Sequence, residues 1–222
     1  HTGANTAGVA YSTDGGANWS QVFFLLGNPN SRTVSVFPQT ATTWYACGST
    51  NDDLGGVDGF IAKTTNGGSS WAISTGYQEL LDVEFSLTNP LYGIAVGSAG
   101  AMVETFDGGT TWTAFQRPGT EGITDVDFVG ATAYQCGYTY ASSSAGDEIE
   151  AHREGFVDAI NESGLPTPLF SLGQVGGGNI IYEIAVVGNA VSMATIYAGT
   201  GRLFEKRGEA ALAQVYDNGS VP

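Results

Sequence analysis

Positive charge is scarce in this sequence: seven Lys and Arg face 22 Asp and Glu among 222 residues, a formal net charge of −15. A surface this negative repels phosphate backbones and anionic lipid headgroups, which argues against nucleic-acid binding and favours cationic partners. Charged residues of both signs make up only 13% of the chain, about half the share of an average soluble domain. Ser, Thr, Asn and Gln supply the polarity instead, as in many β-rich proteins that work outside the cytoplasm.

Cysteine and long hydrophobic runs are also scarce. Cys47 and Cys136 form no C-x-x-C pair, which argues against a zinc or iron–sulfur site. Both lie in similar strand-like contexts, so we expect buried free thiols rather than a disulfide. No apolar run approaches the ~20 residues of a membrane-spanning helix, and the longest, 180–187, is interrupted by Tyr182 and Glu183. Any membrane association is therefore expected to be peripheral and to pass through a partner.

Glycine, in contrast, is abundant at 33 residues, and a glycine pair marks a pattern that recurs three times. Each copy reads Ser/Thr-x-Asp/Asn-Gly-Gly-x-x-Trp. The Asp or Asn residues lie 52 and then 41 residues apart, which matches the ~40–50 residues of a propeller blade. The residues of the pattern are Asp14, Gly15, Gly16 and Trp19, then Asn66, Gly67, Gly68 and Trp71, and finally Asp107, Gly108, Gly109 and Trp112.

The chemistry of the pattern predicts a hairpin turn. An Asp or Asn side chain accepts hydrogen bonds from nearby backbone N–H groups, and the glycine pair allows the positive φ angles that a tight turn requires. The Trp begins the next strand and packs back across the sheet. Because these side chains are occupied in holding the turn, their predicted role is structural.

The same strand order surrounds each turn. An alternating apolar strand comes first, at 33–38, 80–87, 124–129 and 181–187. A second strand, rich in small residues, follows at 44–48, 92–97, 133–137 and 191–198. A third strand leads to the turn, at 60–65, 101–106, 155–160 and 203–206, and a fourth begins near the Trp position.

This order predicts an all-β fold, a β-propeller of four-stranded antiparallel blades in a single domain over 1–222. The expected blades cover about 31–77, 78–118, 122–172 and 178–217, and residues 1–27 carry only the last two strands of an earlier blade. Five blades is therefore the predicted count. The incomplete first blade needs two further strands from upstream residues, from the 214–222 tail or from a partner, since propellers close by removing exposed edges.

The recurrent turn is the Asp-box, or BNR repeat, and it resembles the turns of sialidases, sortilin-type receptors, xyloglucan-cleaving glycosidases and the photosystem II assembly and stability factors of plastids and cyanobacteria. Residues 92–112 are most similar to the last family, with a Gly-Ile-Ala-Val-Gly strand, a glycine turn and a Thr-Phe-Asp-Gly-Gly-Thr-Thr-Trp segment. The resemblance covers 9–113 best. It implies a propeller fold, and it suggests a lumenal role in assembling a photosynthetic complex.

Enzymatic activity is not expected. A sialidase needs three arginines that converge on a carboxylate, and of the five present, Arg117 and Arg207 are expected at blade edges; the others are Arg32, Arg153 and Arg202. A glycosidase needs two carboxylates held ~5–10 Å apart, and with 22 acids such a pair is too easily proposed to be informative. No catalytic residue and no cofactor is predicted.

Two acidic insertions are the candidate partner-binding loops. Both lie between the second and third strands of a predicted blade, so both should project from the same face. Loops on a rigid scaffold carry most recognition, whereas calcium binding through their oxygens is an alternative without EF-hand spacing to support it. The candidate residues are Asp52, Asp53 and Asp58 in the first loop and Asp147, Glu148, Glu150, His152 and Arg153 in the second.

The sequence thus predicts a non-enzymatic binding or scaffold propeller, a subunit or assembly factor of a larger, photosynthetic complex with protein partners, located in the thylakoid lumen or another extracytoplasmic setting. The alternative is a secreted or cell-surface propeller that binds carbohydrate or resembles glycoside hydrolases.

Overall fold

The computed structural model describes residues 6–25, 31–51, 57–140, 153–160, 166–171, 181–186, 194–198, 202–206 and 213–217. Eighteen β-strands account for the secondary structure of these residues. The chain divides into two compact units, His1–Val83 and Glu84–Pro222. Among the described residues there is no helix able to span a membrane.

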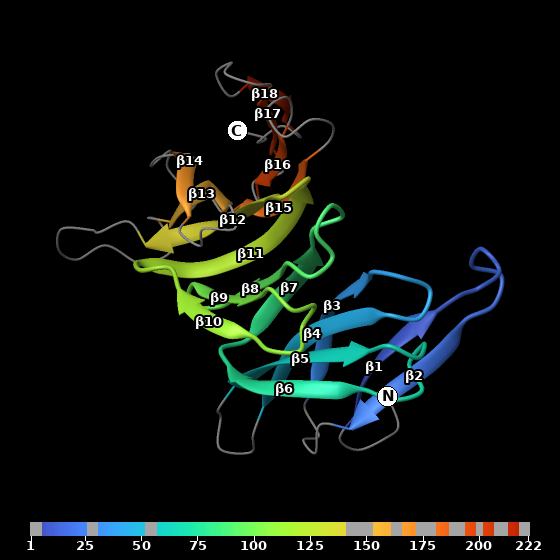
Figure 1. Cartoon of the computed structure of the whole chain (residues 1–222). Helices are drawn as coiled ribbons and strands as arrows, with labels where there is room; N and C mark the ends of the chain where they lie inside the picture. Colours follow the sequence, from blue (N-terminus) through green and yellow to red (C-terminus); the bar gives the residue numbers. More distant parts are fainter. Residues whose placement is uncertain are drawn as a thin grey trace. The chain divides into compact units, whose positions relative to one another are not determined.

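Four sheets contain four strands each, and within each sheet the strands that are consecutive in the chain lie side by side and pair antiparallel (Figure 1). One sheet consists of β3 (Arg32–Pro38), β4 (Trp44–Asn51), β5 (Val57–Thr64) and β6 (Ala72–Tyr77). The next consists of β7 (Leu80–Phe85), β8 (Gly93–Gly97), β9 (Ala101–Thr105) and β10 (Thr113–Gln116). A third consists of β11 (Thr120–Val129), β12 (Thr132–Tyr140), β13 (Arg153–Ile160) and β14 (Thr167–Ser171). The last consists of β15 (Ile181–Val186), β16 (Ala194–Ala198), β17 (Arg202–Lys206) and β18 (Ala213–Asp217).

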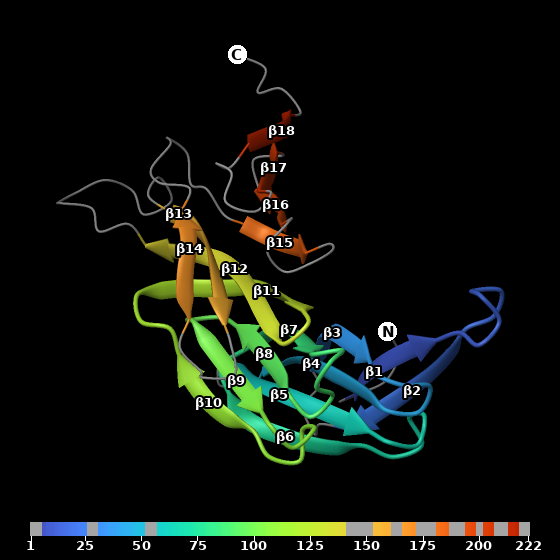
Figure 2. The ribbon, with the colours of Figure 1, turned by 45° about the horizontal axis from the view of Figure 1, so that its top comes forward.

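A two-stranded sheet precedes these four. It pairs β1 (Thr6–Tyr11) with β2 (Ser20–Leu25), from Thr6 opposite Leu25 to Tyr11 opposite Ser20. Within the first unit this pair lies beside the sheet β3–β6 (Figure 2). The predicted all-β fold with four-stranded antiparallel sheets is confirmed, and the strands expected first in each sheet, at 33–38, 80–87, 124–129 and 181–187, correspond to β3, β7, β11 and β15.

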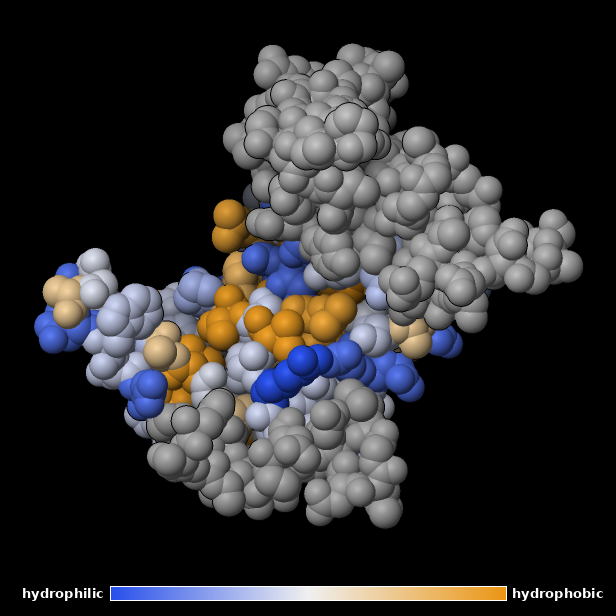
Figure 3. All heavy atoms as spheres, turned by 180° about the vertical axis from the view of Figure 1, so that it is seen from behind, coloured by the Kyte–Doolittle hydropathy of each residue, from blue (hydrophilic) through white to orange (hydrophobic). Residues whose placement is uncertain are grey.

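Alternation of apolar residues places the core. In β7, Leu80, Val83 and Phe85 are buried, whereas all five residues of β8 and of β9 are buried because both faces of these central strands are covered. In the second unit, Ile94 and Val96 of β8 share a core cluster with residues of β11 and β13. Hydrophobic side chains also reach the surface in patches between hydrophilic ones (Figure 3).

Glycine is required in β4 and β12, the second strands of their sheets, at the points where each comes close to its neighbouring strand. A Cβ on Gly48 of β4 would lie 2.0 Å from the Arg32 carbonyl oxygen, and one on Gly137 of β12 would lie 2.1 Å from that of Gly122. Both contacts fall beside register shifts in the adjacent strand. The bulge therefore brings backbone so close that only glycine fits.

The two cysteines occupy matching positions in these strands, Cys47 opposite Ser35 and Cys136 opposite Asp125. Both are free and buried, which confirms the predicted thiols. Burial, with Asp82 nearby, raises the pKa of Cys47 well above its usual range, so its thiol stays protonated and unreactive.

Candidate functional site

The three glycine-pair turns are closed by local hydrogen bonds. In the first, Asp14 Oδ1 accepts from the Asn18 N–H at 2.8 Å, and Ser12 Oγ accepts from the Gly16 N–H at 2.8 Å. The turns at Asn66 and Asp107 repeat these bonds with Thr64 and Thr105 as the hydroxyl acceptors. All six glycines of the three pairs have positive φ, between 64° and 93°.

Two of these turns hold a carboxylate that accepts several bonds. Hydrogen bonds from the Asn18 backbone, the Asn18 side chain and Ser12 lower the pKa of Asp14 to about 2. Bonds from the Thr111 side chain and backbone do the same for Asp107. In the second turn the neutral amide of Asn66 takes the same place. Because an amide can replace the carboxylate, the turn depends on an acceptor and not on charge.

The three Trp residues that follow these turns differ in exposure. Trp71 packs against the core cluster that joins β1 to β4 and β5, and Trp112 meets Phe85 edge-on with ring centroids 5.9 Å apart. Trp19 is 65% exposed, although its Nε1–H donates to the Gly16 carbonyl at 3.1 Å. Equivalent sequence positions thus give two packed rings and one on the surface.

The acidic insertions connect the second and third strands of their sheets, β4 to β5 and β12 to β13. Most of the predicted partner-binding residues lie outside the described residues: Asp52, Asp53, Asp147, Glu148, Glu150 and His152. Asp58 is exposed near the start of β5, and its carbonyl accepts from Thr50 Oγ1 at 3.3 Å. Arg153 opens β13 opposite Tyr140. Within the described ranges, no group of three His, Cys, Asp or Glu side chains is placed to hold a metal ion.

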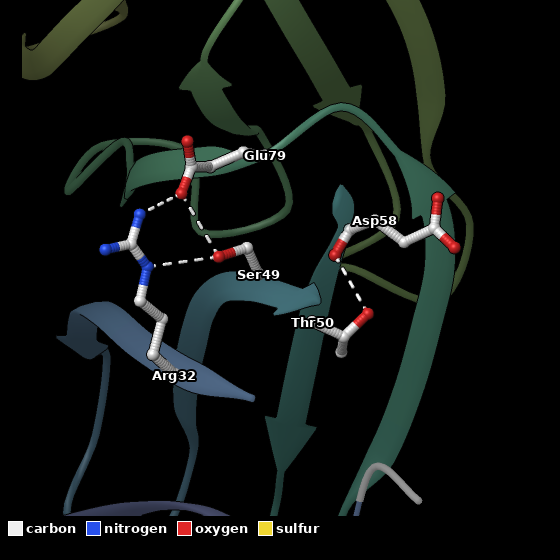
Figure 4. Close-up of polar contacts among 5 residues, drawn as sticks. All are labelled: Arg32, Ser49, Thr50, Asp58 and Glu79. Atoms are coloured by element: carbon white, nitrogen blue, oxygen red, sulfur yellow. Dashed lines mark hydrogen bonds and ion pairs between the residues drawn. The ribbon is translucent and has the colours of Figure 1, made fainter. Parts of the chain in front are cut away.

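A polar cluster not predicted from the sequence lies at the strand ends from which the first insertion leaves (Figure 4). We call it the Arg32 cluster: Arg32, Ser49 and Glu79. Arg32 Nε donates to Ser49 Oγ at 3.1 Å, and Arg32 Nη2 donates to Glu79 Oε1. Ser49 Oγ also donates to Glu79 Oε1 at 3.1 Å. The Arg32 side chain is 62% exposed, so the cluster holds a guanidinium in a fixed place at the surface.

A second cluster is buried in the other unit. We call it the Arg117 cluster: Arg117, Thr120, Gln135 and Asp158. Arg117 Nε donates to Asp158 Oδ2 at 2.6 Å and its Nη1 to Thr120 Oγ1 at 2.7 Å, while Gln135 Nε2 donates to Asp158 at 3.2 Å. The guanidinium also lies 3.9 Å from the centroid of the Phe156 ring. Arg117 follows the edge strand β10, but its side chain reaches the fully buried Asp158 instead of lying at the edge.

Among the described residues of the second unit, Glu104 of β9 is the other buried acid. It is 2% exposed and lies opposite Ile94 of β8. Burial raises the pKa of its carboxyl to about 6, and its Oε1 has no hydrogen-bond partner among the described residues. Its neutral form therefore suits the core.

Comparison with family models gives no match, and comparison with curated proteins gives none either. Among solved structures, an ancestral GH74 enzyme is similar at 18% identity with a TM-score of 0.69, over 96% of this chain and 31% of that enzyme. YCF48 from Cyanidioschyzon merolae is similar at 15% identity with a TM-score of 0.52, over 94% of this chain and 66% of that protein. YCF48 bound to D1 peptide gives 15% identity and a TM-score of 0.45, over 99% and 78%.

These comparisons define the class of the protein. The described four-stranded antiparallel sheets and the likeness in fold to the GH74 enzyme make it an all-β protein of the β-propeller class. At these identities the likeness shows the fold alone, and the chain spans about a third of the GH74 enzyme and just under two thirds of the red-algal YCF48.

Proposed function

We propose that this chain is a non-enzymatic binding or scaffold propeller, an extracytoplasmic subunit or assembly factor of a larger photosynthetic complex. The observation that carries the proposal is that carboxylates throughout the described chain serve as acceptors within the fold. Such acceptor roles favour a framework over a catalytic centre, because general acid–base chemistry needs carboxyl groups presented to a substrate. These carboxylates are Asp14, Glu79, Asp82, Asp107, Asp125 and Asp158.

The binding face is the end of the sheet β3–β6 that carries the first acidic insertion. Asp58 is exposed there, and the sequence adds Asp52 and Asp53 in the same loop. The Arg32 cluster gives this end a rigid base, with Ser49 almost fully buried beneath the guanidinium. With a net charge of −15 for the chain, the partner that this face selects is a basic protein segment, drawn in by long-range attraction.

The proposed photosynthetic setting rests on similarity to the turns and fold of other proteins and not on a binding site of this chain. The turns resemble those of photosystem II assembly and stability factors, and the fold is similar to that of the red-algal YCF48. Both observations support the thylakoid lumen as the location and a membrane-complex subunit as the partner.

The alternative is a secreted or cell-surface propeller that binds carbohydrate. The higher TM-score with the GH74 enzyme favours it, and so does Trp19, whose exposed ring is held in place by its bond to Gly16. Aromatic rings of this kind offer flat apolar surfaces to which sugar rings can bind.

Co-purification from native membranes separates the two functions. We expect the protein to carry photosynthetic-complex subunits with it, and the captured partner to dissociate as salt is raised, because screening weakens attraction between exposed charges. Replacing Asp52, Asp53 and Asp58 by Asn should weaken binding of that partner about tenfold, mainly through slower association.

A charge-matched control distinguishes this loop from net charge alone. Ala72→Lys, Thr75→Lys and Thr113→Lys add the same three units of charge at exposed strand positions, and this variant should bind within about twofold of the original. Equal losses of affinity in the two variants would contradict the assignment of the acidic loop as the partner-binding site. A clean monomer that binds or hydrolyses xyloglucan oligosaccharides would support the alternative instead.

A further inference from the structure

The second of the three glycine-pair turns has an asparagine where the other two have an aspartate. Asn66 is exposed and is followed directly by Gly67. An asparagine in this position loses its side-chain amide readily, because glycine has no side chain to hinder the attack of its backbone nitrogen on the preceding residue. The sequence contains the Asn-Gly pair twice, and only the copy at 66–67 lies among the described residues.

The modification needs water as its only co-reactant. The Gly67 nitrogen gives up its proton and bonds to Cγ of Asn66, the Cγ–Nδ2 bond breaks, and Nδ2 leaves as ammonia. The succinimide ring that results takes up water and opens at one of two bonds. If the bond from nitrogen to Cγ breaks, position 66 becomes aspartate. If the bond to the backbone carbonyl carbon breaks, it becomes isoaspartate, whose main chain passes through Cγ and is therefore longer.

The folded turn restrains the first step. The Gly67 N–H donates to the Thr42 carbonyl at 2.9 Å. Asn66 Oδ1 accepts from the Ser70 N–H at 2.9 Å and from Thr64 Oγ1 at 3.0 Å. Asn66 Nδ2 donates to Ser70 Oγ at 2.8 Å. Because these bonds hold both the attacking nitrogen and the leaving amide, the ring closes only when the turn opens locally.

The third turn shows that aspartate fits this place. Asp107 Oδ1 accepts from the Thr111 N–H at 2.8 Å, and the corresponding bond of the second turn joins the Ser70 N–H to Asn66 Oδ1. Thr111 Oγ1 also donates to Asp107 Oδ2 at 2.6 Å. Ser70 Oγ can donate in the same way once a carboxylate replaces the amide, since a hydroxyl is both donor and acceptor. Aspartate at position 66 therefore keeps the bonds that close the turn.

Isoaspartate does not fit in the same way. Thr64 Oγ1 accepts from the Gly68 N–H at 3.0 Å, and position 66 lies between these two residues, so a longer main chain there moves the donor from its acceptor. Gly68 has little room to shift, because a Cβ built on it would lie 2.9 Å from the Val22 side chain. Trp71, further along, packs against the core cluster that joins β1 to β4 and β5. The longer main chain thus disturbs both the turn and the packing beside it.

We propose that Asn66 is a deamidation site and that the folded turn retains aspartate as the product. The succinimide forms again from either product by loss of water, so the product that keeps the hydrogen bonds of the turn accumulates over repeated openings. The modification adds a negative charge at the place where Asp14 and Asp107 carry theirs in the other two turns. The site is separate from the acidic loop, so it is independent of the proposed function.

Peptide mapping of the natural protein tests the proposal. Cleavage after Lys63 and Glu79 releases residues 64–79, in which Asn66 is the only asparagine. The protein is incubated at mildly alkaline pH, either folded or unfolded in guanidinium chloride, and mass spectrometry follows the amide-to-acid mass change of this peptide. A protease that cleaves before aspartate and not before isoaspartate separates the products. We expect conversion in the folded protein to be at least ~10-fold slower than in the unfolded chain, with mostly aspartate where the unfolded chain gives a mixture.

Matched variants locate the restraint. Thr64→Val removes the hydroxyl that closes the second turn and should speed the conversion of Asn66 about fivefold. Thr105→Val removes the equivalent hydroxyl of the third turn and should leave that rate within about twofold of the original. Asn66→Asp makes the product directly and should unfold at the same denaturant midpoint as the original. Circular dichroism checks that the three variants are folded.

Four results would overturn the proposal. The first is no conversion at Asn66 in the folded protein when the unfolded chain converts, and the second is the same share of isoaspartate in both. The third is a clearly lower denaturant midpoint for Asn66→Asp, which would mean that the turn does not accept a carboxylate at this position. The fourth is equal acceleration in Thr64→Val and Thr105→Val, which would show that the restraint does not come from this turn. The first three measurements do not depend on the folding of either threonine variant.

Discussion

The Arg32 and Arg117 clusters use the same chemistry in opposite surroundings. Each places a guanidinium against a hydroxyl and a carboxylate. In the first, the Arg side chain is 62% exposed and its acid 19%; in the second, the Arg is 18% exposed and its acid is fully buried.

This difference decides what each cluster contributes. An exposed ion pair is worth ~0–1 kcal/mol, because water solvates the separated charges nearly as well. Breaking a buried pair costs ~3–5 kcal/mol, because the remaining charge has no substitute for its partner. The Arg117 cluster therefore stabilises the second unit, whereas the Arg32 cluster contributes little to the stability of the first.

Asp158→Ala should have the largest effect on the free energy of unfolding, and it tests the difference between the Arg117 and Arg32 clusters. It leaves the Arg117 guanidinium and the Gln135 amide without their acceptor in a closed site, so we expect a loss of ~3–5 kcal/mol in the free energy of unfolding. Urea denaturation followed by near-UV circular dichroism measures it. A loss below ~1 kcal/mol would mean that the site opens to water and that the two clusters do not differ as described.

Glu104 provides a test of how burial, which raises the pKa of its carboxyl group, makes stability depend on pH. Its pKa is about 6 in the folded protein against 4.5 ordinarily, so the unfolded state binds fewer protons between these values. Stability should then fall by about 2 kcal/mol in total as the pH rises through both values, from about 3.5 to about 7, and stay lower above that range.

Glu104→Gln should abolish that part of the pH dependence, because the amide stays neutral at every pH. The variant should match the original near pH 4 and exceed it by about 2 kcal/mol at pH 7. Unfolding curves at a series of pH values measure this, with Asp58→Asn as the exposed control. An unchanged slope in Glu104→Gln would show that another group titrates in this range.

The sequence predicted the fold well because its signals are local. The strands at 33–38 and 124–129 alternate within a few residues, and the glycine-pair turns close over four residues, so no distant contact is needed to infer them. The matching contexts of Cys47 and Cys136 likewise predicted two buried thiols.

The clusters could not be predicted because they join distant parts of the chain. Arg32 and Glu79 are 47 residues apart, and Arg117 and Asp158 are 41 apart. In each pair one residue lies just outside a strand, and its partner is decided by how the sheets pack and not by the nearby sequence. The scarcity of basic residues was the available signal. In a chain with seven Lys and Arg, a carboxylate about one blade length away is a natural candidate partner for each arginine.

Arg32→Ala should give the smallest effect on stability, below ~1 kcal/mol in the free energy of unfolding. Ser49 Oγ keeps its bond to Glu79 when the guanidinium is removed, so no buried polar atom is left without a partner. Arg117→Ala is the matched control and should cost several times more, since it leaves the buried Asp158 charge uncompensated. Urea denaturation of both variants gives the ratio. If Arg32→Ala proved as costly as Arg117→Ala, the two clusters would not differ in the way that their burial implies.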